Sequence, residues 1–184
     1  MALTESNMLE LGVEAPDFSL LDTISGKEIS LETIKSDKAT VVMFTCNHCP
    51  YVIHINNELV QLATEYQAKG VAFVAISSND VDNYPQDGPE KMKALAEAEG
   101  YPFPYLYDAT QVVAKSYDAA CTPDFYVFDG DLALRYRGRL CASRPNTGVP
   151  VTGADLRAAL DALLAGNPVS EKQYPSAGCN IKWK

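Results

Sequence analysis

The stretch Thr45-Cys46-Asn47-His48-Cys49-Pro50-Tyr51 decides the fold of this chain. It follows the apolar, β-prone run 41–44, and after it apolar residues recur every three or four positions, as on one face of a helix. The two cysteines therefore lie where a strand passes into a helix. The N-terminus of a helix offers unpaired N–H groups and the positive end of the helix dipole, and both stabilise a thiolate over a thiol. The pattern predicts a reactive Cys-X-X-Cys pair that closes a small, reversible disulfide.

The composition narrows the class of protein. The chain has 184 residues and a formal net charge of −9, which argues against a nucleic acid or an anionic membrane surface as a partner. Its length and hydrophobic content of 47% predict a single domain over residues 1–184. Residues 1–14 carry no signal-peptide pattern and no later segment approaches a membrane span, so we expect a cytoplasmic protein. Five cysteines, an odd number, do not suggest a disulfide scaffold.

The rest of the chain alternates between strand and helix patterns. We expect a β-hairpin over 17–31, a helical turn at 32–36, strands at 40–45, 71–77 and 101–107, helices at 49–68, 89–100 and 110–117, a second hairpin over 124–137, and a last helix that Thr152 caps. This order predicts an α/β fold in which helices flank a central mixed sheet and the first hairpin forms an N-terminal extension. Residues 169–184 show no periodicity.

This order of elements, with a Cys-X-X-Cys pair at the start of the first long helix, resembles the thioredoxin fold. Ala15-Pro16-Asp17-Phe18 is similar to the segment that opens the peroxiredoxins. The stretches Phe44–Val52, Ala75–Asp80, Cys121–Phe125 and Gly178–Lys184 resemble bacterial thioredoxin-family, peroxiredoxin-like proteins of the alkyl hydroperoxide reductase and thiol-specific antioxidant superfamily. The resemblance covers nearly the whole chain and implies a thiol:disulfide oxidoreductase with a redox or antioxidant role and no cofactor.

The resemblance also implies roles for the residues of the pair. Cys46 would attack a substrate disulfide and Cys49 would resolve the mixed disulfide, with a protein dithiol or disulfide, or a small thiol, as the partner. An imidazolium at His48 would stabilise the thiolate and push the pair toward an oxidising potential. The alternative for His48 is a solvated loop residue.

Four further residues are candidates for substrate binding: Thr45, Cys121, Thr122 and Pro123. Thr122-Pro123 falls where the thioredoxin fold keeps a cis-proline that faces the cysteine pair, which would leave Thr122 backbone groups free to pair with an extended substrate. Cys121 could face the same pocket or serve as a small core residue.

Hydroperoxide is an alternative substrate. The peroxiredoxin motif Pro-x-x-x-Thr-x-x-Cys does not fit this chain, because alignment on Cys49 puts Val42 and Cys46 at the proline and threonine positions, and alignment on Cys46 puts Met43 where threonine belongs. Standard peroxidase chemistry is therefore disfavoured, although a sulfenic acid on Cys46 could be resolved by Cys49.

Functions of another class also fit the residues. Cys46, His48, Cys49 or Cys121 could bind zinc or copper, although a closed structural site usually needs two spaced pairs. A redox-inactive binding module is the other alternative.

Several other residues are expected to have structural roles. Strand 40–45 contains no acid, so the buried carboxylate of thioredoxins has no counterpart there and His48 is the nearest replacement. His54 should be a surface or packing residue, and Cys141 and Cys179, in irregular segments, should not be catalytic. Arg135, Arg137 and Arg139 alternate along one face of a strand and its exit. We interpret them as a solvated, charged strand edge, with the binding of an anion or of an acidic partner as the alternative.

Overall fold

A seven-stranded mixed sheet forms the centre of the structure, a computed structural model in which residues 3–184 are described. Its strand order is β3-β2-β6-β5-β4-β8-β9. The central strand β4 (Ala39–Phe44) pairs in parallel with β5 (Val71–Ser77) and antiparallel with β8 (Asp124–Asp129). Helix α2 (Pro50–Gln67) connects β4 to β5. The predicted strand-helix-strand unit that carries the cysteine pair is therefore confirmed.

The other predicted elements are also present. The N-terminal hairpin pairs with β6, so it extends the main sheet. The remaining elements of this part of the fold are β2 (Ser19–Asp22), β3 (Glu28–Ser30), α1 (Leu31–Ile34), a 3-10 helix (Pro85–Asp87), α3 (Pro89–Glu99), β6 (Tyr105–Tyr107), α4 (Val112–Ser116), β9 (Leu134–Gly138) and α5 (Ala154–Leu164). Gly153 rather than Thr152 is the N-cap of α5, because a φ of 66° at this position suits glycine.

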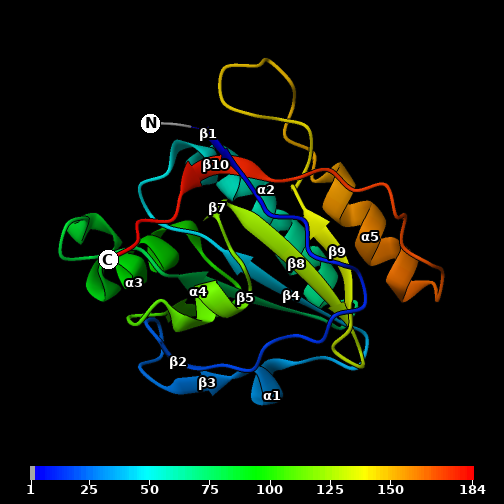
Figure 1. Cartoon of the computed structure of the whole chain (residues 1–184), viewed down its shortest axis with the longest axis horizontal. Helices are drawn as coiled ribbons and strands as arrows, with labels where there is room; N and C mark the ends of the chain where they lie inside the picture. Colours follow the sequence, from blue (N-terminus) through cyan, green and yellow to red (C-terminus); the bar gives the residue numbers. More distant parts are fainter. Residues whose placement is uncertain (1–2) are drawn as a thin grey trace.

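Helices cover both faces of the sheet (Figure 1). Side chains alternate along β4, so Val41 and Met43 pack with the apolar sides of α2, α3 and α5, while Val42 and Phe44 pack with α1 and α4. Both faces of the strand are fully buried. This packing holds β4 rigidly and fixes the position of the segment that follows it.

A second, three-stranded sheet brings the two ends of the chain together. It has the order β1-β10-β7, with β1 (Leu3–Glu5), β10 (Ala177–Asn180) and β7 (Cys121–Thr122). Figure 1 shows β10 in red beside β1 and β7. A Cβ at Gly178 would collide with the backbone carbonyl of Thr122, so only glycine allows this close pairing. Sequence patterns did not reveal β1 or β10, because both strands are short and lack alternation.

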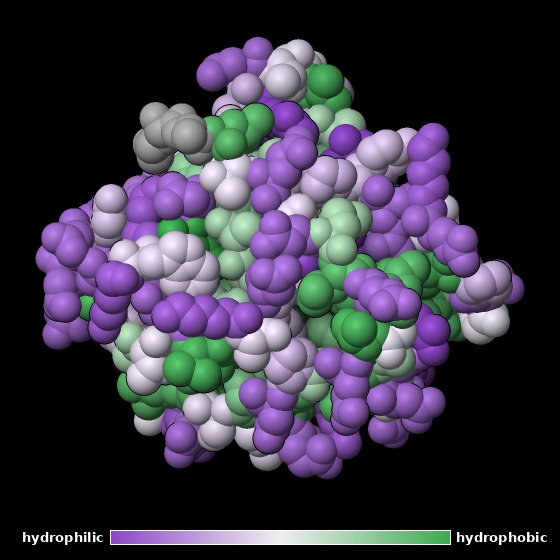
Figure 2. All heavy atoms as spheres, viewed as in Figure 1, coloured by the Kyte–Doolittle hydropathy of each residue, from purple (hydrophilic) through white to green (hydrophobic). Residues whose placement is uncertain are grey.

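The surface drawn in Figure 2 is mainly polar. Figure 2 shows a face that is mainly hydrophilic, on which hydrophobic residues form small, separate groups. Within residues 3–184, no helix has the length and apolar character needed to span a bilayer.

The expectation of a solvated arginine edge is wrong for Arg137. Arg135 is exposed and pairs with Asp129, but the Arg137 side chain is fully buried. Its guanidinium donates to Asp124 at 3.1 Å and to the Tyr126 hydroxyl at 2.7 Å. The reason is that the irregular C-terminal segment covers β9, as the hydrogen bond from the Arg137 N–H to Gln173 shows.

The buried Arg137–Asp124 pair predicts an asymmetric response to mutation. Burial raises the pKa of Asp124 to about 7, although Arg137 opposes this shift. Asp124→Asn leaves a buried guanidinium that cannot lose its proton, and we expect a loss of about 3–5 kcal/mol in the free energy of unfolding. Arg137→Gln leaves a carboxyl group that can be protonated. Since the folded-state pKa is then above the unfolded value, Arg137→Gln should cost less at pH 5 than at pH 8.

Urea unfolding at the two pH values measures both effects. Arg135→Gln is the matched control, because its ion pair is exposed and should be worth about 0–1 kcal/mol. A cost of Arg137→Gln that does not change with pH would contradict the interpretation.

Candidate active site

The cysteine pair lies between the end of β4 and the start of α2, as the sequence predicts. The Thr45 N–H continues the sheet by donating to the carbonyl of Ile76 at 2.9 Å. Cys49 is the N-cap residue of α2, and Pro50 occupies the first helical position, where a missing N–H costs nothing. The chain from Cys46 to Cys49 is therefore held at both ends.

The two thiols hydrogen-bond to each other and meet Thr122. The Cys46 Sγ lies 3.5 Å from the Thr122 hydroxyl, and the Cys49 Sγ lies 3.2 Å from the Thr122 carbonyl oxygen. The Thr122-Pro123 peptide bond is cis, which confirms that prediction. All five cysteines are free thiols, and the side chains of Cys46 and Cys49 are 1% and 0% exposed. The two cysteines therefore form a dithiol that is shielded from solvent.

A buried carboxylate lies next to this pair, although sequence analysis found none. Asp87, in the 3-10 helix after β5, is fully buried. It accepts hydrogen bonds from the Asn47 N–H at 2.8 Å and from the Asn79 side chain at 2.8 Å, and its Oδ2 lies 2.6 Å from the His48 Nδ1. The available signal was the polar stretch 78–89, rich in Asn, Asp and Pro, which directly follows the expected strand 71–77.

His48 faces this carboxylate and an aromatic ring. Besides its contact with Asp87, the imidazole stacks on Tyr84, with 5.6 Å between ring centroids and an 8° interplanar angle. Asp87 and Tyr84 therefore position His48 and the loop between the cysteines. One donor atom each of Cys46, His48 and Asp87 lies within 4.8 Å of the others, so these three residues could also share a metal ion.

The surroundings favour the anion on Cys49. A hydrogen bond from the Cys46 thiol lowers the pKa of Cys49, and hydrogen bonds from the thiol and backbone of Cys179 and from the Val52 backbone add to this shift. Burial opposes this shift in the pKa of Cys49. The same hydrogen bond to Cys49, burial and the negative charge of Asp87 raise the pKa of Cys46 well above its ordinary value. In the reduced protein Cys46 thus holds the shared proton.

Strand β10 fills the edge at which we expected an extended substrate. Thr122 pairs in antiparallel register with Cys179, so the prediction that its backbone is free is wrong in this conformation. Cys179 also lies in an ordered strand rather than an irregular segment, and it packs in one cluster with Cys46, Cys49 and Val52. The chain itself therefore covers the cysteine pair.

Cys121 lies deeper in the same region. It is fully buried, its thiol donates to the Pro123 carbonyl oxygen at 3.8 Å, and burial raises its pKa. A raised pKa keeps Cys121 as a thiol at neutral pH, so it is a poor nucleophile.

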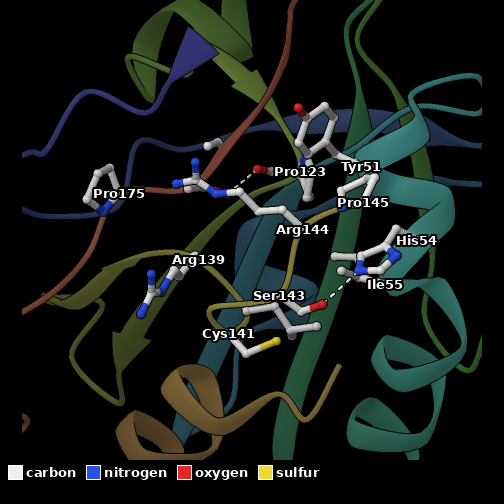
Figure 3. Close-up of a pocket in the computed structure, with 13 residues that line it drawn as sticks. Tyr51, His54, Ile55, Pro123, Arg139, Cys141, Ser143, Arg144, Pro145 and Pro175 are labelled. Carbon is white, nitrogen blue, oxygen red and sulfur yellow. Dashed lines mark hydrogen bonds between the residues drawn. The ribbon is translucent and has the colours of Figure 1, made fainter. Parts of the chain in front are cut away.

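A pocket beside Pro123 borders the covered pair (Figure 3). Pro123 and Tyr51 line it, and Tyr51 also packs against the cluster that contains Cys46 and Cys49. The guanidinium groups of Arg139 and Arg144 lie on the side away from His54. Arg139 pairs with Asp155 at 2.7 Å, whereas half-buried Arg144 forms no ion pair within residues 3–184. The pocket therefore offers positive charge next to the cis-proline.

Two residues with expected structural roles line the same pocket. The His54 Nε2 lies 2.7 Å from the Ser143 hydroxyl, which ties α2 to the loop after β9 and agrees with a packing role. Cys141 lies in that loop and is buried.

Comparison with known proteins identifies the group to which these features belong. A sequence model described as "AhpC/TSA family" matches residues 11–137. The structure of an uncharacterized conserved protein from Geobacillus kaustophilus is 64% identical, has a TM-score of 0.99, and aligns over 100% of this chain and 97% of that one. A hypothetical protein from Sinorhizobium meliloti 1021 is 48% identical, with a TM-score of 0.96 and 98% of each chain covered.

More distant structures show the fold alone. Peroxidoxin BcpB from Mycobacterium tuberculosis is 21% identical, with a TM-score of 0.64 over 86% of this chain and 98% of that one. No curated protein matches the chain. The thioredoxin fold with a central mixed sheet is thus confirmed.

The electrostatics predict where the thiolate resides. The ultraviolet absorbance of the reduced protein should show a thiolate at neutral pH that is lost only on acidification. Cys49→Ser should abolish this signal. Cys46→Ala should move the titration upward toward about 8.5, because Cys49 loses its strongest hydrogen-bond donor. Cys141→Ser should change nothing, and an unshifted titration in Cys46→Ala would refute the shared proton.

Proposed function

This chain belongs to the AhpC/TSA family, and on that premise we propose that it is a thiol:disulfide oxidoreductase in which Cys46 and Cys49 cycle between dithiol and disulfide. The observation that carries the proposal is the hydrogen-bonded pair of thiols at the N-terminus of α2, with one thiol stabilised as an anion. The proposed setting is the cytoplasm, where a thiol pool can return the pair to its reduced form.

The contacts suggest how the pair would react. The family resemblance assigns the attack to Cys46, but the resting anion is on Cys49. The proton must therefore pass along the hydrogen bond from Cys46 to Cys49, and the Thr122 hydroxyl, 3.5 Å from the Cys46 Sγ, can then donate to the new thiolate. Cys46 attacks the substrate disulfide and releases one substrate thiolate. Cys49 then attacks the Cys46 sulfur of the mixed disulfide, which closes the Cys46–Cys49 bond and frees the second substrate thiol.

Reduction of hydroperoxides is the second candidate, and membership of the AhpC/TSA family favours it. In that reaction the Cys46 thiolate takes an oxygen atom from the peroxide and becomes a sulfenic acid, which Cys49 converts to the disulfide with loss of water. The residues near Cys46 argue against high efficiency, because the motif proline and threonine are missing.

The pocket beside Pro123 suggests the class of substrate. Arg144 offers a half-buried guanidinium without a carboxylate partner among the described residues, in a chain with a net charge of −9. An arginine binds a carboxylate with directed, charge-assisted hydrogen bonds. We therefore propose a small disulfide or thiol that carries a carboxylate, with that group in the pocket and its sulfur toward the cysteine pair.

A metal site is a candidate of another class. The proximity of the donor atoms of Cys46, His48 and Asp87 is the observation that favours it. Stoichiometric zinc in the freshly purified protein, lost together with folding stability on Asp87→Asn, would support this function over redox cycling.

The first experiment separates the redox functions. Fully reduced protein receives one equivalent of either oxidised glutathione or hydrogen peroxide, and free thiols are alkylated at time points before peptide mapping. We expect a Cys46–Cys49 disulfide to form faster with oxidised glutathione than with peroxide. The opposite order would favour the peroxidase, and the absence of any disulfide involving either cysteine under both conditions would refute both redox functions.

A second experiment tests the pocket. Arg144→Gln should lower kcat/KM for oxidised glutathione by roughly 10- to 100-fold, since one charge-assisted contact is worth about 1.5–3 kcal/mol. The same variant should react normally with hydroxyethyl disulfide, which has no carboxylate. Arg135→Gln, exposed on β9 and outside the pocket, is the matched control. An equal loss with both disulfides would show that Arg144 does not bind the carboxylate.

A further inference from the structure

Three cysteines, not two, meet at the start of α2. Cys179 from β10 packs in the same cluster as Cys46 and Cys49, and all three side chains are at most 4% exposed. The Cys179 thiol and its backbone both hydrogen-bond to Cys49. Cys49 therefore lies in contact with two thiols, one from its own Cys-X-X-Cys motif and one from the far end of the chain.

Strand β10 holds Cys179 directly beside the residues that surround the other two sulfurs. Strand β10 pairs with β7 directly opposite Thr122, the residue whose hydroxyl and carbonyl oxygen face the other two sulfurs. Strand β10 thus occupies the edge to which an extended substrate would otherwise add. The close approach at Gly178 and the pairing of β10 with β1 on its other side hold the strand there.

We propose that Cys179 is a third redox-active thiol that exchanges with the Cys46–Cys49 disulfide to form a Cys49–Cys179 disulfide. The inference rests on the proposed function, which supplies the first disulfide and its oxidant, a disulfide or a hydroperoxide. The Cys179 Sγ attacks the Cys49 Sγ, the Cys49–Cys179 bond forms, and the Cys46–Cys49 bond breaks with its electron pair on Cys46. The proton given up by Cys179 ends on Cys46, and the protein undergoes no net change in oxidation state.

Oxidation of Cys49 removes a negative charge next to Cys179, which makes the Cys179 thiol easier to deprotonate. In the reduced protein, burial and then the hydrogen bond to the Cys49 anion raise the pKa of Cys179 to about 12, while Lys182 opposes the shift. Once Cys49 is part of a disulfide it carries no charge, so that part of the shift disappears. Cys179 is thus inert while Cys49 is reduced and becomes a better nucleophile when Cys49 is oxidised.

The exchange has a functional consequence. The disulfide then joins the motif to the C-terminal strand β10. Cys46 becomes a thiol again, beside Thr122 and Asp87. A protein with only the Cys-X-X-Cys pair would hold both sulfurs oxidised until a reductant arrived.

Tryptic peptides distinguish the two disulfides in the full-length wild-type protein. Cys46 and Cys49 lie together in peptide 39–69, whereas Cys179 lies in peptide 173–182. The reduced protein is treated with one equivalent of oxidised glutathione, alkylated at time points and digested. We expect a disulfide within 39–69 to appear first, followed by a cross-link between 39–69 and 173–182 in which Cys46 carries the alkyl group.

The outcomes separate this inference from the function on which it rests. A disulfide that stays within 39–69, with Cys179 alkylated at every time point, overturns the inference and leaves the oxidoreductase intact. The absence of both disulfides overturns both.

Variants then assign the partner of Cys179. Cys46→Ser should retain the cross-link as its only internal disulfide, whereas Cys49→Ser and Cys179→Ser should lose it completely. Cys141→Ser, a buried cysteine in peptide 140–157, is the matched control and should cross-link as the wild type does. A cross-link that survives in Cys49→Ser would overturn the assignment of Cys49. Because the wild-type map needs no substitution, the test does not depend on the folding of any variant.

Discussion

The hydrogen bonding of β4 on both sides is the constraint on which the site depends. The strand pairs with β5 on one edge and with β8 on the other, and its two faces are buried under different sets of helices. Its end at Phe44 therefore cannot move independently of its neighbours. The loop after β5 brings Asp87, and β7 with the residue after it brings Thr122 and Pro123, so that both segments meet the cysteine pair at that point.

This arrangement also explains why the reduced dithiol carries a single negative charge. The negative charge of Asp87 lies near Cys46, while N–H and S–H donors gather around Cys49. The result is one proton on the first sulfur and one negative charge on the second. A stabilised thiolate favours the reduced form of a pair and shifts its potential in the oxidising direction. The contact with Asp87 fixes the His48 imidazole against the loop between the two cysteines.

The sequence predicts the parts of this site that have a local signal. The junction at Cys46 and Cys49 follows from the change in hydrophobic period, and the cis-proline at Pro123 follows from family resemblance. Asp87 was missed because its role depends on how a polar loop folds back, which no periodicity encodes. Strand β10 was missed for a related reason, since its four residues are defined by pairing with β7 and β1 and not by their own pattern.

Because the sulfurs are buried, different substrates require the fold to open to different extents. A macromolecular disulfide could reach Cys46 only if β10 or the side chains that pack on the pair moved, because the side chain is 1% exposed. A small disulfide that binds beside Pro123 would need a smaller displacement, since Tyr51 both lines that pocket and packs against the cysteine cluster. The proposed exchange between Cys49 and Cys179 needs only a short approach of two sulfurs that are already in hydrogen-bonding contact. For this reason the proposed substrates are small disulfides, and the proposed third thiol lies within the chain.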